Sequence, residues 1–183
     1  MAQTTTLYRF RIDLSDVDRG VYDLLDFRVA MHPSESMQYL LTRVIAFALN
    51  SQQDLEFSPA GLGDPEVPAM RVEVLGSGRI SLWIEIGNPS PKKLHKAAKA
   101  AQTVKVYTYK DANLILRECA GENIHQAEKI AIHALDYKFL DKIAEGIQRD
   151  NKWSLLHHDN SITISWGEQS ETSNIKTLSL SPN

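Results

Sequence analysis

The sequence predicts an α/β (α+β) protein with a mixed central sheet flanked by helices and with β-hairpins at the N-terminal and C-terminal ends. Strand and helix patterns alternate through the middle of the chain. Residues 79–109 follow the order strand, helix, strand, which implies a parallel pair joined by a right-handed crossover. We expect one domain over residues 1–167. The stretch 168–183 is rich in Ser, Thr and Asn and is predicted to be a disordered tail.

The N-terminal elements follow from two periodicities. Residues 6–14 alternate apolar and polar side chains, and residues 21–31 form the second strand of a predicted hairpin. After the segment HPSES (32–36), we expect a helix with Pro33 and Glu35 in its first turn. The apolar stripe of that helix consists of Met37, Leu40, Leu41, Val44, Ile45 and Ala48.

The middle of the chain begins with a predicted loop over 54–68, which contains three prolines and two glycines. Residues 70–75 and 79–87 flank the turn Gly76-Ser77-Gly78, a pattern typical of a β-hairpin. A helix over 92–102 follows, with its apolar side chains on one face.

The C-terminal half continues the alternation. We expect a strand over 103–109, a helix over 111–119, a strand over 128–136, a helix over 136–148 and a closing hairpin over 152–167.

Composition excludes several classes of protein. The hydrophobic fraction of 43% suits a globular core, and no stretch approaches the length of a membrane span. The net charge of −3 favours neither nucleic acid nor membranes globally, so a polyanion site would have to be a local patch. Cys119 is the only cysteine and the N-terminus shows no signal-peptide pattern, so we expect a cytoplasmic protein that does not bind membranes.

Glu85 is the residue that the hairpin pattern singles out. In the strand 79–87, the aliphatic side chains point to one face, while Glu85 and Trp83 point to the other. A carboxylate on an inner strand costs free energy unless it is hydrogen-bonded, paired or bound to a metal ion. Pairing with a neighbouring basic residue is the ordinary alternative to metal binding.

Further charged residues are predicted to lie near Glu85. The hairpin register places position 85 opposite about position 69, at the end that carries Asp64 and Glu66. The next helix carries a stripe of Lys92, Lys96 and Lys99. Acids that converge beside a lysine suit Mg²⁺ or Mn²⁺ and a phosphate group. The alternatives are ordinary loop acids and a solvated helix face.

Other charged residues allow two interpretations. Glu35 either contributes to the acidic site or complements the dipole of the helix it precedes. His157-His158 offers imidazole ligands, although a pair of turn residues is the commoner arrangement.

The motifs HPSES, LWIEIG (82–87), Pro91 followed by KKLHKA, and VYTY (106–109) resemble the bacterial YaeQ family. The resemblance runs from about residue 6 to residue 167 in the same order of elements. It implies a variant of the PD-(D/E)XK, restriction-endonuclease-like fold, in which a mixed sheet is flanked by helices.

The resemblance also implies roles for individual residues. Glu35 matches the helix acid, and Glu66 or Asp64 matches the acid that enters the hairpin, although the segment GDPEVP differs from the family in order and length. Glu85 matches the acid of the (D/E)XK strand. The lysine of that motif is replaced by Gly87, and Lys96 or Lys93 from the following helix would substitute for it.

Two functions follow as expectations. The first is a metal-dependent nuclease in which Glu85 and Glu66 or Asp64 hold Mg²⁺ or Mn²⁺, Glu35 orients water or the metal ion, and Lys96 steadies the phosphate. The second is a non-catalytic module that binds nucleic acid or a regulatory protein partner through the cleft or the lysine stripe. The acids favour the first function, and the missing lysine favours the second.

Overall fold

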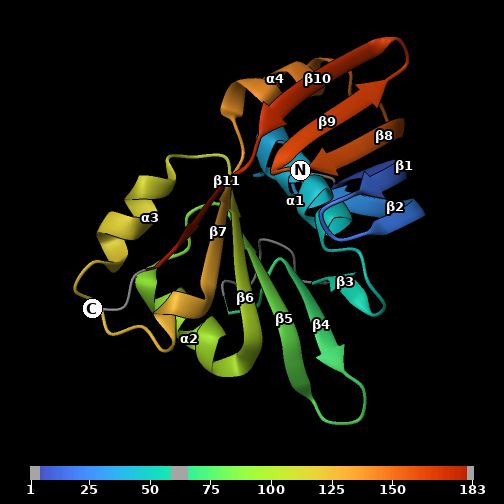
Figure 1. Ribbon diagram of the computed structural model, residues 1–183. Coiled ribbons are helices and arrows are strands. Elements are labelled where there is room, and N and C mark those ends of the chain that lie inside the picture. The colour runs from blue at the N-terminus through green and yellow to red at the C-terminus, as the bar shows by residue number, and fades with distance from the viewer. Residues whose placement is uncertain (1–4, 59–65, 181–183) are drawn as a thin grey trace. The chain divides into compact units, whose positions relative to one another are not determined.

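The computed structural model describes residues 5–58 and 66–180. The contacts within the chain divide it into two compact units. Unit 1 contains Met1–Leu49 and Leu135–Ile175, and unit 2 contains Asn50–Ala134 and Lys176–Asn183. The predicted mixed α/β class is confirmed, because the described residues form two mixed sheets and four α-helices (Figure 1). The prediction of a single central sheet is wrong, because each unit has a sheet of its own.

Unit 1 contains a five-stranded sheet and two helices. The strand order is β10-β9-β8-β1-β2, in which β1 pairs in parallel with β8 and the other neighbours are antiparallel. The elements are β1 (Thr6–Asp16), β2 (Val21–Met31), α1 (Met37–Leu49), α4 (Tyr137–Glu145), β8 (Asp150–His158), β9 (Ser161–Trp166) and β10 (Gln169–Asn174).

Unit 2 contains a six-stranded sheet with the order β11-β7-β6-β5-β4-β3. β5, β6 and β7 are parallel, as the strand–helix–strand pattern predicted for the first pair. The elements are β3 (Leu55–Phe57), β4 (Met70–Val74), β5 (Arg79–Ile86), α2 (Pro91–Ala100), β6 (Ala101–Thr108), α3 (Ala112–Cys119), the 3₁₀ turn η2 (Ala127–Lys129), β7 (Ile130–Ala134) and β11 (Lys176–Ser179).

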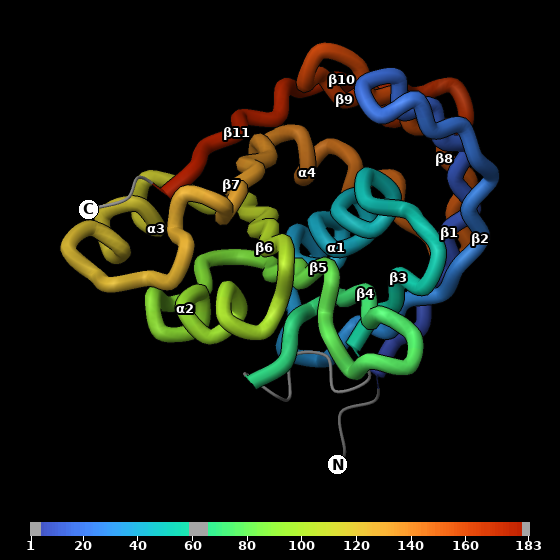
Figure 2. Tube along the Cα trace, turned by 60° about the horizontal axis from the view of Figure 1, so that its bottom comes forward, coloured from blue at the N-terminus to red at the C-terminus, as the bar shows by residue number. Residues whose placement is uncertain are grey.

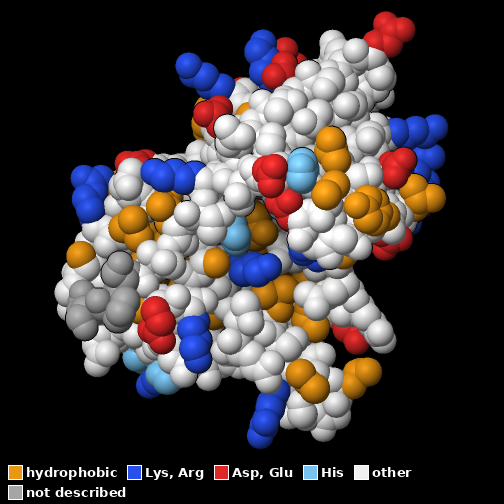
Figure 3. Space-filling view, viewed as in Figure 1, with side chains coloured by type: hydrophobic (Ala, Val, Ile, Leu, Met, Phe, Trp, Pro, Cys, Tyr) orange, Lys and Arg blue, Asp and Glu red, His pale blue; other side chains and the backbone are white. Residues whose placement is uncertain are grey.

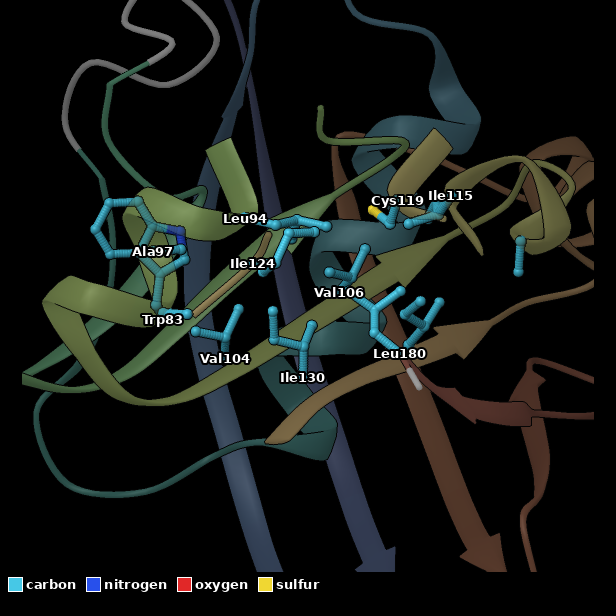
Figure 4. Close-up of a cluster of buried hydrophobic side chains, with 13 residues drawn as sticks. Trp83, Leu94, Ala97, Val104, Val106, Ile115, Cys119, Ile124, Ile130 and Leu180 are labelled. Atoms are coloured by element: carbon cyan, nitrogen blue, oxygen red, sulfur yellow. The ribbon is translucent and has the colours of Figure 1, made fainter. Parts of the chain in front are cut away.

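The core of unit 2 lies between its parallel strands and the helices α2 and α3. Figure 4 shows Trp83, Val106 and Ile130 from three strands beside Leu94 of α2 and Ile115 of α3. Figure 2 shows the same two helices next to β5, β6 and β7. These apolar contacts fix α2 against the end of β5, where Glu85 lies.

Three local predictions need correction. The loop predicted over 54–68 contains the short strand β3, which pairs with β4. Pro33 and Glu35 precede α1 instead of lying in its first turn, because Ser36 caps the helix: its Oγ accepts a hydrogen bond from the backbone N–H of Tyr39 at 3.1 Å.

The third correction concerns the C-terminal stretch. The prediction of disorder is wrong over 169–179, where β10 pairs with β9 and β11 pairs with β7. β10 has no buried residue, so apolar burial could not reveal it. Its stability comes from the backbone ladder and from cross-strand contacts such as the Thr163–Thr172 hydroxyl pair at 2.8 Å. The single domain over 1–167 stays a prediction. Within the described ranges, no helix is long and apolar enough to cross a membrane.

Asn151 offers a test of the parallel β1–β8 pairing. Its buried amide donates to the carbonyl oxygens of Gln148 at 2.7 Å and Arg9 at 3.2 Å, and its Oδ1 accepts from the Gln148 N–H at 2.9 Å. Asn151→Ala leaves these backbone groups without partners, so we expect a loss of about 1–3 kcal/mol in the free energy of unfolding. Urea denaturation measures it. The exposed Asn174→Ala is the control, and equal effects of the two substitutions would contradict this role.

Candidate functional site

Glu85 lies on an inner strand of unit 2, between β4 and β6. Met70 pairs with Ile84, and the Ala69 N–H donates to the Ile84 carbonyl oxygen at 3.0 Å. The predicted register of position 85 against about position 69 is therefore confirmed. Glu85 and Trp83 share the face opposite Ile84, as expected. Both faces of the strand are buried, because Trp83 and Glu85 are each 3% exposed and Ile84 is 0% exposed.

Both carboxylate oxygens of Glu85 accept hydrogen bonds from side chains of unit 2. The indole Nε1 of Trp83 donates to Oε1 at 2.6 Å. The ammonium Nζ of Lys93 lies 2.8 Å from Oε2. Burial raises the pKa of Glu85, while the hydrogen bond and charge of Lys93 and the hydrogen bond of Trp83 oppose that rise. The pairing expected as the alternative to metal binding is thus present.

The turn after β5 and the start of α2 bring Lys93 to this carboxylate. Gly87 has a φ of +88°, which glycine adopts without a steric penalty, and its N–H donates to the Tyr107 carbonyl oxygen at 2.8 Å. Ser90 then caps α2, because its Oγ accepts from the backbone N–H of Lys93 at 3.3 Å, and Pro91 occupies the first turn. Lys93 therefore lies in the first turn of α2, within reach of Glu85.

A second acid contacts the same helix one turn later. Lys96 forms an ion pair with Glu66, and both side chains are about half or more exposed. Residues three apart on a helix are neighbours, so Lys93 and Lys96 hold Glu85 and Glu66 on one side of α2. These four side chains, Glu66, Glu85, Lys93 and Lys96, are called the acid–lysine cluster below. Asp64, the other predicted ligand, lies outside the described residues.

Glu35 forms its contacts within unit 1. Its Oε2 accepts from the His32 backbone N–H at 3.0 Å and lies 2.7 Å from Nη2 of Arg43. Its side chain is 1% exposed, and burial raises its pKa despite the opposing charge of Arg43. The pair fixes the HPSES segment to α1, so the acid has a structural role of its own. Its role in a metal or catalytic site stays a prediction.

Some features of the site were not evident in the sequence. The indole of Trp83 donates to Glu85, and strand alternation placed the two side chains on one face without indicating this hydrogen bond. A second polar cluster of unit 2, which shares no residue with the acid–lysine cluster, joins Asn50 to the Tyr107 hydroxyl at 2.8 Å and to Nζ of Lys105 at 2.7 Å. The signal in the sequence that could have indicated this second polar cluster is Lys105, a charged residue at an inner position of the predicted strand 103–109.

The chemistry of the acid–lysine cluster combines two hard oxygen donors with two cations. Carboxylates are the ligands that Mg²⁺ and Mn²⁺ prefer, so the donor type fits such an ion. Among the described residues, neither Glu66 nor Glu85 belongs to a group of three or more carboxylate, imidazole or thiol ligands close enough to hold one ion. Two carboxylates leave most positions around an ion to water and substrate.

Glu85→Gln tests the free-energy cost of ionising the buried carboxyl. Burial raises the pKa of Glu85 above the usual 4.5. At a pH between 4.5 and the raised pKa, the folded protein therefore retains a proton on Glu85 that the unfolded chain has released. This contribution to stability is present below pH 4.5 and is lost as the pH rises through the raised pKa. We therefore expect the stability of the unsubstituted protein to fall relative to Glu85→Gln between pH 4.5 and neutral pH.

The measurement is urea denaturation across that pH range. Glu73→Gln, which alters an exposed acid on the neighbouring strand β4, serves as the control and should leave the pH profile unchanged. If the unsubstituted protein instead gained stability relative to Glu85→Gln as the pH rises, the attraction of Lys93 for the ionised carboxylate would exceed the cost of burying it. That result would contradict the raised pKa of Glu85.

Comparisons with known proteins give the family of this chain. A family model described as YaeQ protein matches residues 1–175. An uncharacterised YaeQ protein of Escherichia coli K12 is 32% identical over 110 residues, which cover 60% of this chain and only 59% of that relative. One from Salmonella typhi is 26% identical over 167 residues, or 90% of this chain and 91% of the relative.

Two crystal structures of YaeQ proteins are similar in fold. The one from Pseudomonas syringae has a TM-score of 0.85 at 25% identity and covers 100% of this chain and 99% of its own. The one from Xanthomonas axonopodis pv. citri has a TM-score of 0.86 at 25% identity, with coverage of 98% and 100%. The relation to the PD-(D/E)XK fold stays a prediction. The chain belongs to the YaeQ family.

Proposed function

We propose that unit 2 binds a phosphodiester group of nucleic acid at the acid–lysine cluster and hydrolyses it when Mg²⁺ or Mn²⁺ is present. One observation carries this proposal: Nζ of Lys93 lies 2.8 Å from Oε2 of Glu85. The (D/E)XK pattern needs a lysine beside its strand acid, and Gly87 occupies that position in the sequence. A lysine from α2 supplies the missing cation at the same carboxylate.

The metal ligands in this proposal are Glu85 and Glu66, with Asp64 as the further predicted ligand. A bound Mg²⁺ or Mn²⁺ would activate a water molecule and neutralise charge on a phosphoryl oxygen. The low exposure of Glu85 limits the access of bulk water to its carboxylate, which strengthens electrostatic interactions there.

The lysines of α2 provide the affinity for phosphate. In the acid–lysine cluster the negative charges of two carboxylates cancel the positive charges of two ammonium groups, so a bound dication gives the cluster a net positive charge. Lys93 and Lys96 can then exchange a carboxylate oxygen for a phosphate oxygen, since an ammonium carries three donors. Lys92 and Lys99 are exposed on the same helix and extend the positive surface for the nucleic-acid backbone. A cytoplasmic protein is part of this proposal, because Cys119 is the only cysteine.

The second candidate is a module that binds nucleic acid or a protein partner without cleavage. It is favoured by the donors that Glu85 already has, because Trp83 and Lys93 occupy both of its oxygens. A cation bound at either oxygen would also lie beside the Lys93 ammonium, whose positive charge opposes it. In this second candidate the buried pair stabilises the fold, and exposed lysines of α2 carry the binding.

Cleavage of labelled DNA and RNA tests the proposed function. We expect the unsubstituted protein to cut single-stranded or double-stranded substrates with Mg²⁺ or Mn²⁺ and not with EDTA. Glu85→Gln and Lys93→Met should each lower the rate at least 100-fold, since each removes a group at the reacting phosphate. Lys99→Met, an exposed lysine of the same helix, is the control and should keep most of the rate. Salt-sensitive binding without cleavage in any condition would overturn the nuclease and support the second candidate.

Calorimetric titration with Mn²⁺ separates metal binding from catalysis. We expect binding heat in the unsubstituted protein and at least a tenfold weaker affinity in Glu85→Gln, because a neutral amide replaces a carboxylate ligand. Glu73→Gln should bind as the unsubstituted protein does. An affinity that is the same in all three proteins would remove Glu85 from the metal site.

A further inference from the structure

Two turns of unit 1 meet at one end of its sheet. Because β1 and β8 are parallel and Asp16 pairs with His157, the turn after each strand lies at the same end. The β8–β9 turn consists of Asp159 and Asn160, with φ of 50° and 58°, which are the signs of a type I′ turn. Asp18, from the β1–β2 turn, accepts backbone hydrogen bonds from Asp159 at 2.8 Å and Asn160 at 3.1 Å.

These contacts bring two carboxylates and an imidazole together. Nδ1 of His158 lies 3.5 Å from Oδ1 of Asp18, and Nε2 of His158 lies 3.4 Å from Oδ2 of Asp159. One ligand atom from each of the three residues lies within 4.8 Å of the others. Ligand atoms around a tetrahedral Zn²⁺ are roughly 3.3 Å apart, because each bond is about 2.0 Å long. The exposed side chains of His158 and Asp159 can close the remaining gap by rotation.

His157 supports this cluster from the interior side of the turn. Asp16, with 0% exposure, contacts Nδ1 of His157 at 2.9 Å and also pairs with Arg19 at 2.6 Å. Nε2 of His157 in turn lies 3.6 Å from Oδ2 of Asp18. Carboxylates that bind metal ions are commonly supported by outer-shell groups, and His157, oriented by the buried Asp16, is such a neighbour of Asp18. Asp18 is thus held by the neighbouring turn and by a buried acid–histidine pair.

We propose that Asp18, His158 and Asp159 form a binding site for a divalent transition-metal ion such as Zn²⁺, with water completing the coordination. One nitrogen and two carboxylate oxygens are a donor set that Zn²⁺ accepts, and the open positions allow an exogenous ligand to bind. In Figure 3, acidic side chains flank a histidine near the place where β8 ends in Figure 1. The site belongs to unit 1 and shares no residue with the acid–lysine cluster of unit 2.

Calorimetric titration with Zn²⁺ tests the site. We expect one Zn²⁺ per chain, with the affinity reduced at least tenfold in His158→Ala and in Asp159→Asn. His125→Ala removes an exposed histidine of unit 2 and is the matched control, which should bind as the unsubstituted protein does. Glu85→Gln should also retain the site, so failure here is distinguishable from failure of the proposed function. Melting curves without metal confirm that each variant folds.

Several results would overturn the proposal. The proposal is wrong if the unsubstituted protein does not bind Zn²⁺, or if His158→Ala binds it with unchanged affinity. An equal loss of affinity in His125→Ala would also contradict it, because that result indicates nonspecific binding to surface histidines. Asp18→Asn adds a further measurement, in which we expect the Zn²⁺ affinity to fall because the third ligand loses its charge. The amide oxygen can accept only one of the two backbone hydrogen bonds of the turn, so the melting curve of this variant is needed to show that it folds.

Discussion

The carboxylate of Glu85, on a strand that is covered on both faces, constrains the structure around it. An isolated charge in such a position costs several kcal/mol, and the protein offsets this cost with donors to each oxygen. Trp83 supplies one from the same strand, and Lys93 supplies the other from α2. The second donor requires a helix that starts directly after the strand, which the left-handed turn at Gly87 and the cap at Ser90 provide. The apolar packing of α2 then keeps Lys93 in place.

Much of the fold could be predicted because its signals are local. The strands of the three hairpins, the four helices and the parallel β5–β6 pair each follow from a periodicity or from a turn within a short window. The β1–β8 pair has no such signal, because its partners are far apart in the chain and each strand shows only its own alternation. β10 was hidden because its side chains are polar on both faces and only its backbone ladder defines it.

The same distinction between local signals and distant contacts explains which parts of the candidate site could be predicted. The position of Glu85 and its register follow from strand alternation and from the hairpin turn, so the sequence predicts both. The choice between Lys93 and Lys96 depends on the angle at which α2 leaves the sheet, which no single segment determines. The structure uses both lysines, one for each acid. Glu35 has a local partner, Arg43 on the helix that follows it, and this explains its burial without any ligand.

Diffraction from crystals soaked in Mn²⁺, with anomalous data, tests the central claim most directly. If the acid–lysine cluster is a metal-dependent phosphodiester site, the anomalous peak lies about 2.2 Å from a carboxylate oxygen of Glu85, and Nζ of Lys93 moves away from that oxygen. If the pair of Glu85 and Lys93 stays intact and no peak lies near either acid of the cluster, the pair is purely structural. That result would contradict the proposed metal-dependent function.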